Sequence, residues 1–180
     1  WGLIARILHW ATGAVIIFMM GLGVYMTQFV TDIYEQFGLF QTHKSWGFVA
    51  FALGALRLIW RAVNTTPELP DGMKSWEVRA SQLSHLSLYV LMIAMPVSGW
   101  LMASASPLQD SYGIKNMVFA SFEYPDPFVP GSQDLETLFS TIHTACAIAI
   151  GCIVLVHIAA ALKHQFHAKD GLLRRMIVGS

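Results

Sequence analysis

Charged residues are scarce in this sequence. Lys, Arg, Asp and Glu make up 12% of its 180 residues, about half the proportion found in an average soluble domain. Hydrophobic residues make up 55%, and this composition excludes a disordered chain, a nucleic-acid-binding protein and an ordinary soluble enzyme. The 11 basic and 11 acidic residues cancel, so only the positions of the charges along the chain are informative.

Cysteine is also rare. The two cysteines, Cys146 and Cys152, lie in one apolar stretch and point to different faces of a helix. They provide neither a disulfide framework nor the spacing of a metal site.

Long uncharged runs are what the sequence has instead. No charged residue occurs between Arg6 and Asp32, between Arg79 and Asp110, or between Glu136 and Lys163. Each run exceeds the roughly 20 residues that a helix needs to cross about 30 Å of hydrocarbon. A fourth apolar segment has basic residues only near its ends, where long side chains can reach the membrane surface. We predict an all-α fold, a transmembrane four-helix bundle forming one domain over residues 1–180, with helices at about 6–29, 40–62, 82–104 and 138–164.

The basic residues indicate how these helices are oriented. One side of the membrane would carry Arg6, Arg57, Arg61, Lys74, Arg79, Lys163, Lys169, Arg174 and Arg175. The other would carry Lys44 and Lys115 with seven acidic residues, Asp32, Glu35, Asp110, Glu123, Asp126, Asp134 and Glu136. Because basic residues favour the cytoplasmic side, we expect both termini and the 63–81 loop to be cytoplasmic. The proline-containing segment 105–137 is predicted to be an irregular outer cap rather than a fifth span.

Histidine is the unusual component of the predicted spans. Five of the seven histidines lie in or at them: His9, His43, His85, His143 and His157. Ionisable groups inside a membrane are costly and usually functional. No Asp or Glu accompanies them within a span, which disfavours a proton-coupled or cation transporter. A histidine-lined metal transporter remains an alternative.

The spacing of His143 and His157 suggests two cofactors at two depths. Fourteen residues advance a helix by about 21 Å and turn it through nearly four whole turns. Both imidazoles therefore leave one face of the helix, one near the outer leaflet and one near the inner. Small residues lie between them, leaving room for something flat and large: Ala147, Ala149 and Gly151.

Histidines on other helices match these two depths. His43 lies near the outer end of the second predicted helix, level with His143. His9 lies near the inner end of the first, level with His157. Two imidazoles on one iron are a b-type haem arrangement, and the absence of Cys-x-x-Cys-His excludes covalent c-type attachment. Two axial histidines leave no open position at the iron, so we predict two haem b groups that transfer electrons.

Further residues fit the binding of haem. Lys44 is placed to neutralise propionates at the outer face, and Arg57 and Arg61 to do so at the inner face. Gly47 and Gly54 form a small-residue stripe that would allow close packing against a porphyrin or against another helix.

His85 and His164 are predicted to form a quinone site. His85 begins the third predicted helix at the inner depth, so three histidines compete there for two axial positions. His164 follows His157 by seven residues, on the same face and about 10 Å nearer the cytoplasm. A neutral histidine can hydrogen-bond a quinone carbonyl and exchange its proton. The alternatives are a structural role or hydrogen bonding to a propionate.

An ordered set of short motifs resembles the bacterial cytochrome b561 family, with its relatives among the cytochrome b subunits of nickel-iron hydrogenases and formate dehydrogenase. The motifs are Leu8-His9-Trp10, His43 with Gly47, Arg57-Leu58-Ile59-Trp60-Arg61, Pro67-Glu68-Leu69-Pro70, His85 to Tyr89, Met95-Pro96-Val97-Ser98-Gly99, His143 with His157, and Lys163-His164. The resemblance covers essentially the whole chain. It implies a four-helix dihaem protein of the bacterial inner membrane, with His9 paired to His157 and His43 to His143.

Three functions follow from that resemblance. The first is electron transfer between a redox partner on the periplasmic side and a membrane quinone such as ubiquinone. The second is oxidation of superoxide with reduction of ubiquinone, although the acidic outer side opposes the capture of an anion. The third is a non-catalytic anchoring subunit of a larger dehydrogenase, hydrogenase or respiratory complex.

Overall fold

Four long helices dominate the structure, a computed structural model that describes residues 1–65, 67, 72–128 and 130–179. They are α1 (Leu3–Gln28), α2 (Ile33–Val63), α3 (Ser75–Ala105) and α5 (Gln133–Lys163). Each is long and apolar enough to cross a membrane. Large apolar side chains such as Leu155, Val156 and Ile17 are exposed on them. Lipid is the environment in which such surfaces are stable, because water would drive them to associate.

All four helices begin before the predicted spans. The predicted 40–62 helix begins at Ile33, because the Asp32 carboxylate accepts hydrogen bonds from the backbone N–H groups of Tyr34 and Glu35. Similarly, the predicted 138–164 helix begins at Gln133, after a Ser132 cap that accepts from Leu135 N–H. Hydropathy marks the segment inside the hydrocarbon, whereas polar caps mark where a helix begins.

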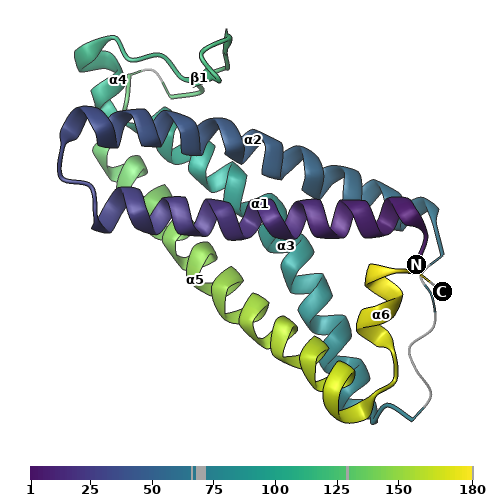
Figure 1. The fold of residues 1–180 in the computed structure, drawn as a ribbon. Coiled ribbons are helices and arrows are strands. Elements are labelled where there is room, and N and C mark those ends of the chain that lie inside the picture. The colour runs from purple at the N-terminus through teal and green to yellow at the C-terminus, as the bar shows by residue number, and fades with distance from the viewer. Residues whose placement is uncertain (66, 68–71, 129, 180) are drawn as a thin grey trace.

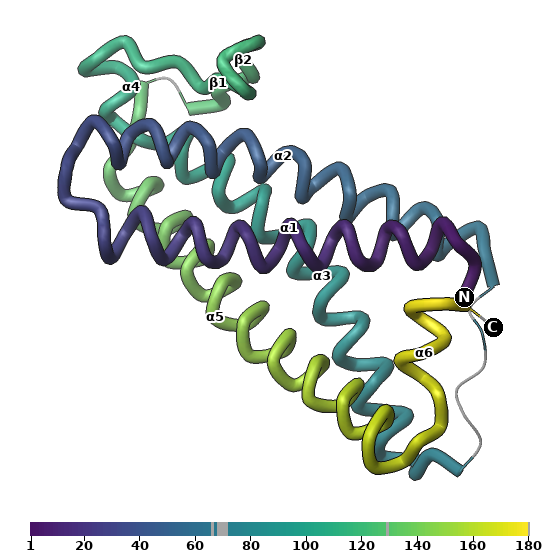
Figure 2. The backbone as a smooth tube through the Cα atoms, viewed as in Figure 1, coloured from purple at the N-terminus to yellow at the C-terminus, as the bar shows by residue number. Residues whose placement is uncertain are grey.

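The four helices form two antiparallel hairpins. In Figure 1, α1 and α2 run side by side, and α3 and α5 form a second pair inclined to the first. The smooth trace in Figure 2 shows the same arrangement. The hairpins meet mainly where α2 packs against α3. There, a Cβ atom placed on Gly54 would lie 3.3 Å from Met92 Cε, so a small residue lets the two helices approach closely.

A small cap covers one end of the bundle. It contains α4 (Pro107–Tyr112) and a hairpin of β1 (Met117–Val118) and β2 (Phe122–Glu123). Phe119 and Ala120, at the turn of this hairpin, both have positive φ. The sequence predicts an irregular segment here and no fifth span, and no additional spanning helix is found among the described residues. The short helix and the two strands were not predicted.

The C-terminal segment lies at the opposite end, beside the N-terminus (Figure 1). It consists of the π-helical turn η1 (His164–Ala168) and α6 (Leu172–Ile177). Arg6 Nη1 donates to Ile177 O at 2.8 Å, and Trp10 Nε1 donates to Met176 O at 2.9 Å. These contacts between side chain and backbone hold both termini at one end of the molecule.

We predict that this end faces the cytoplasm. A C-terminal green fluorescent protein fusion should therefore fluoresce, and a C-terminal alkaline phosphatase fusion should be inactive. Alkaline phosphatase inserted after Gly113, in the cap, should be active in the same cells. The reverse pattern would contradict the orientation inferred from the basic residues.

Candidate functional site

The outer histidine pair lies near the cap. His43 on α2 and His143 on α5 face each other with ring centres 6.3 Å apart and ring planes at 74°. The two side chains come from different hairpins, so the pair connects the hairpin of α1 and α2 with that of α3 and α5. The structure therefore brings together the two histidines that the sequence places at one depth.

The inner level contains three histidines. His9 on α1 has its ring centre 6.1 Å from that of His157 on α5. His85 on α3 is also close to His157, with ring centres 5.5 Å apart. His157 is thus the common member of two imidazole pairs, as expected from the three histidines that compete at this depth.

The spacing within the pairs fits a shared metal. Two imidazoles bound to opposite sides of one metal ion, by bonds of about 2 Å each, have ring centres roughly 6 Å apart. Each pair could supply two nitrogen ligands, and the porphyrin of a haem would supply the remaining ones. In addition, the His43 Nδ1 atom is buried without a hydrogen-bond partner in the described part of the chain. The donor set of both levels therefore fits haem, while the assignment of the axial ligands stays a prediction.

Ser98 and Met95 contact His143, and the sequence assigned neither a role. His143 Nδ1 lies 3.2 Å from Ser98 Oγ and 3.1 Å from Met95 O. Both residues belong to the Met-Pro-Val-Ser-Gly motif of α3. Finding this contact from the sequence would have required the register of α3 against α5.

Arg57 lies at the inner level, at the depth that the sequence predicts. Its Nη2 atom is 2.8 Å from His9 Nδ1. Because a guanidinium only donates hydrogen bonds, the His9 nitrogen accepts here. Binding of iron by His9 Nε2 would place the ring proton on Nδ1 and turn the guanidinium away from it. Arg57 and Arg61 also approach the Tyr89 ring, 5.5 and 5.4 Å from its centre. Tyr89 therefore orients both arginines, a role that the sequence did not reveal. Neutralisation of propionates by Arg57 and Arg61 stays a prediction.

The cap fixes Lys44 at the outer end. Lys44 Nζ donates to Asn116 Oδ1 at 2.9 Å, and Asn116 Nδ2 lies 3.4 Å from an oxygen of Asp126. These contacts of Asn116 were not predicted, because Asn116 is 72 residues away from Lys44 in the sequence. Burial and the nearby Asp126 carboxylate raise the pKa of Tyr124, which stays neutral. The binding of a propionate by Lys44 stays a prediction.

Lys115, the other basic residue expected on the outer side, is also engaged. Its Nζ atom lies 2.8 Å from Glu123 Oε2. This hydrogen bond raises the pKa of Lys115. Both outer lysines therefore have polar partners in the cap.

Small residues and methionines fill the space between the helices. Gly54 packs against Met92, as described above, and Gly47 lies 4.0 Å from Met19 Cε, measured from a Cβ built on the glycine. On α5, a Cβ placed on Gly151 would lie 3.0 Å from Met20 Cε. The unbranched methionine side chain adapts to irregular space. The structure thus shows helix packing at Gly54, and a porphyrin contact at Gly47 or Gly54 stays a prediction.

His164 is separated from the inner cluster. It is buried at the start of η1, and its Nδ1 atom lies 2.5 Å from Asp170 Oδ2. No contact between His85 and His164 is found in the described residues. The predicted Pro67-Glu68-Leu69-Pro70 motif lies, apart from Pro67, outside the described residues.

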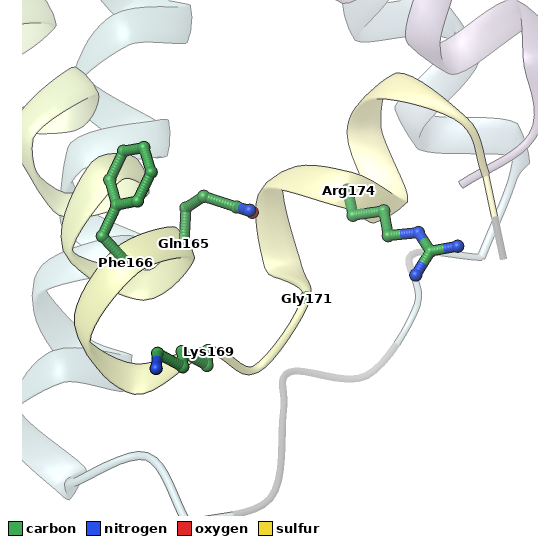
Figure 3. A pocket seen from close by; sticks show the side chains of 5 residues that line it. All are labelled: Gln165, Phe166, Lys169, Gly171 and Arg174. Carbon is green, nitrogen blue, oxygen red and sulfur yellow. The ribbon is translucent and has the colours of Figure 1, made fainter.

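A pocket of about 360 Å³ lies in the C-terminal segment, between η1 and α6. Figure 3 shows its lining residues, of which Gln165 and Phe166 come from η1 and Arg174 from α6. Lys169 and Gly171 complete the lining. Neither His85 nor His164 lines this pocket, so it does not coincide with the predicted quinone site.

Comparison with known proteins identifies the family. Residues 1–179 match the family described as prokaryotic cytochrome b561. The chain belongs to this family. It is 26% identical to cytochrome b561 homolog 2 of Escherichia coli (strain K12) over 179 residues, which cover 98% of this chain and 90% of that protein. Cytochrome b561 homolog 1 of the same organism is 28% identical over 137 residues, which cover 76% of this chain and 73% of that protein.

Membership of this family confirms the general function expected from the sequence. The prokaryotic b561 proteins are membrane cytochromes b, which bind b-type haem and transfer electrons. With its four spanning helices, the chain is a multi-pass protein of the bacterial inner membrane that exchanges electrons with redox partners.

The three inner histidines lead to a prediction. We expect His9→Ala to lose the inner haem, because His9 and His157 have the spacing of opposed axial ligands. His85→Ala should retain the inner haem. The ring centres of His85 and His157, 5.5 Å apart, are closer than the roughly 6 Å expected for two imidazoles on one metal ion. Haem content by the pyridine haemochrome method would measure both. Loss of haem in His85→Ala with retention in His9→Ala would assign the ligand to His85 instead.

Proposed function

We propose that this cytochrome binds two b-type haems, one above the other, and carries electrons between a partner on the periplasmic side and a quinone at the cytoplasmic side. The observation that carries this proposal is the pair of imidazole contacts that α5 makes at two depths, with ring centres 6.1 and 6.3 Å apart. When bound, haem supplies reversible one-electron chemistry at its iron.

The chain's own residues would hold the two groups in place. His43 and His143 would bind the outer iron, and His9 and His157 the inner iron. Two imidazoles on each iron would favour electron transfer over the binding of oxygen. The carboxylates of the haems would be neutralised by Lys44 at the outer end and by Arg57 and Arg61 at the inner end. Gly47 and Gly54 would allow close approach.

His85 and His164 are the proposed quinone-binding residues. Support comes from the position of His85 beside the inner pair and from the buried ring of His164. The Asp170 carboxylate at 2.5 Å orients that ring. An imidazole held in this way can hydrogen-bond a quinone carbonyl and exchange a proton with it. The quinone would be ubiquinone or another membrane quinone.

The cap favours a cationic partner on the outer side. Seven acidic residues are expected there, and both lysines on that side are engaged, Lys44 with Asn116 and Lys115 with Glu123. Such a surface would attract a basic redox protein and repel a small anion such as superoxide. A basic subunit of a larger complex would be attracted in the same way.

The number of haems gives the first test. The purified protein should show the α-band of b-type haem on reduction and contain about two haems per chain by the pyridine haemochrome method. His143→Ala should lose the outer haem and keep most of the inner one, because His157 and His9 are untouched. His167→Ala, which changes an exposed histidine of η1, is the matched control and should keep both. A single haem per wild-type chain would contradict the proposal.

The quinone site gives the second test. We expect His164→Ala to slow the oxidation of the reduced protein by a short-chain ubiquinone at least about tenfold, because a proton-exchanging group is removed. The haem spectrum should be unchanged, and His167→Ala is again the control. Wild-type oxidation rates in His164→Ala would exclude this residue from the site. Failure of the isolated wild-type chain to reduce quinone, together with co-purification of a soluble redox subunit, would favour the anchoring function.

A further inference from the structure

The α3 helix makes a polar contact with the ring of His143 on α5. His143 Nδ1 is 3.1 Å from Met95 O and 3.2 Å from Ser98 Oγ. Ser98 Oγ is itself 2.9 Å from Met95 O. Ser98 is buried, with 3% of its surface exposed. These three polar atoms form a closed triangle away from water.

The hydrogen positions in this triangle follow from the chemistry of its members. The Met95 carbonyl can only accept hydrogen bonds. The Ser98 hydroxyl therefore donates to it, as helical serines commonly do to an earlier carbonyl. The Ser98 oxygen is then free to accept from His143. The proton of the neutral His143 ring accordingly resides on Nδ1, and the lone pair that can bind a metal resides on Nε2.

Gly99 allows the ring to lie this close to α3. A Cβ atom placed on Gly99 would lie 3.0 Å from His143 Cε1 and 3.2 Å from Nδ1, but 3.9 Å from Nε2. The Nδ1–Cε1 edge of the ring therefore rests on α3, and Nε2 is farther from it. A side chain at this position would push the ring away from its hydrogen-bond acceptors.

We propose that Met95 O, Ser98 Oγ and Gly99 fix the tautomer and orientation of His143 and so lower the reduction potential of the outer haem. Ser98 and Gly99 are positioning residues in this account, which rests on the proposed binding of two haems. Acceptors that hydrogen-bond the Nδ1–H group make the imidazole a more basic ligand. A more basic ligand stabilises the oxidised iron relative to the reduced iron.

The effect should be confined to the outer haem. In the described part of the chain, the His43 Nδ1 atom has no hydrogen-bond partner, and the His9 Nδ1 atom faces the Arg57 guanidinium, which is a donor. Among the residues that the structure describes, neither His43 nor His9 has the pair of acceptors that His143 has. The inner haem of the same molecule is therefore an internal reference.

Redox titration of Ser98→Ala in the two-haem protein tests the proposal. We expect the outer haem to become easier to reduce, with its reduced-to-oxidised ratio at the wild-type midpoint raised by up to about tenfold. Tenfold corresponds to about 59 mV for a one-electron couple. The inner midpoint should not move. Ser98→Thr keeps the hydroxyl and should restore the wild-type value. Ser104→Ala is the matched control, because Ser104 lies on the same helix, is 1% exposed and has a hydroxyl with no hydrogen-bond partner among the described residues.

Gly99→Ala provides a second test through geometry. The added methyl group should displace the His143 ring, raise the outer midpoint more than Ser98→Ala does, and change the low-spin electron paramagnetic resonance signal of the outer haem. Gly21→Ala is the control, since a Cβ on Gly21 would meet no atom within 4 Å.

The outcomes separate this inference from the proposed function. The signal that His143→Ala removes identifies the outer haem. Wild-type midpoints in both Ser98→Ala and Gly99→Ala, or equal shifts of both haems, would overturn the inference and leave the two-haem function intact. A wild-type protein that contains one haem or none would overturn the proposed function itself.

Discussion

The contacts between histidine rings of the two helical hairpins are the interaction on which the architecture depends. In hydrocarbon, every backbone polar group must be satisfied within its own helix, so the helices attract one another only through packing and the few polar side chains that they carry. The α1 helix packs chiefly on α2, and α5 chiefly on α3. His9 and His43 reach from one hairpin to histidines on the other. A group bound between these rings would join the hairpins.

The α5 helix sets the depth of both levels. Because His143 and His157 are fourteen residues apart, their positions are determined by helix geometry, whereas their partners come from separate helices whose register depends on packing. Gly54 against Met92 and Gly151 against Met20 provide such packing. A change in either contact would shift one member of a pair relative to α5. Close helix packing and the spacing of the ring pairs are therefore coupled.

Much of this arrangement could be predicted from the sequence, and the remainder depends on contacts that periodicity does not contain. Apolar length predicts the four helices, and the spacing of His143 and His157 predicts which histidines share a depth. The helix starts at Ile33 and Gln133 were missed because they are set by capping side chains. The contacts of Ser98 with His143 and of Arg57 with His9 depend on the rotation of one helix against another, which a single sequence does not specify.

The two histidine levels differ in the groups that face their rings. At the outer level, His143 faces the Met95 carbonyl and the Ser98 hydroxyl, both of which accept. At the inner level, the Arg57 guanidinium lies against His9, and Arg61 is nearby on the Tyr89 ring. A nearby positive charge favours the reduced state of a metal centre, whereas acceptors on the ligand favour the oxidised state. Under the proposed function, the inner level has two arginines against the single Lys44 of the outer level. Together with the acceptors on His143, this difference would make the inner haem the better electron acceptor. Under that proposal, transfer from the periplasmic side towards the cytoplasmic side would be the downhill direction.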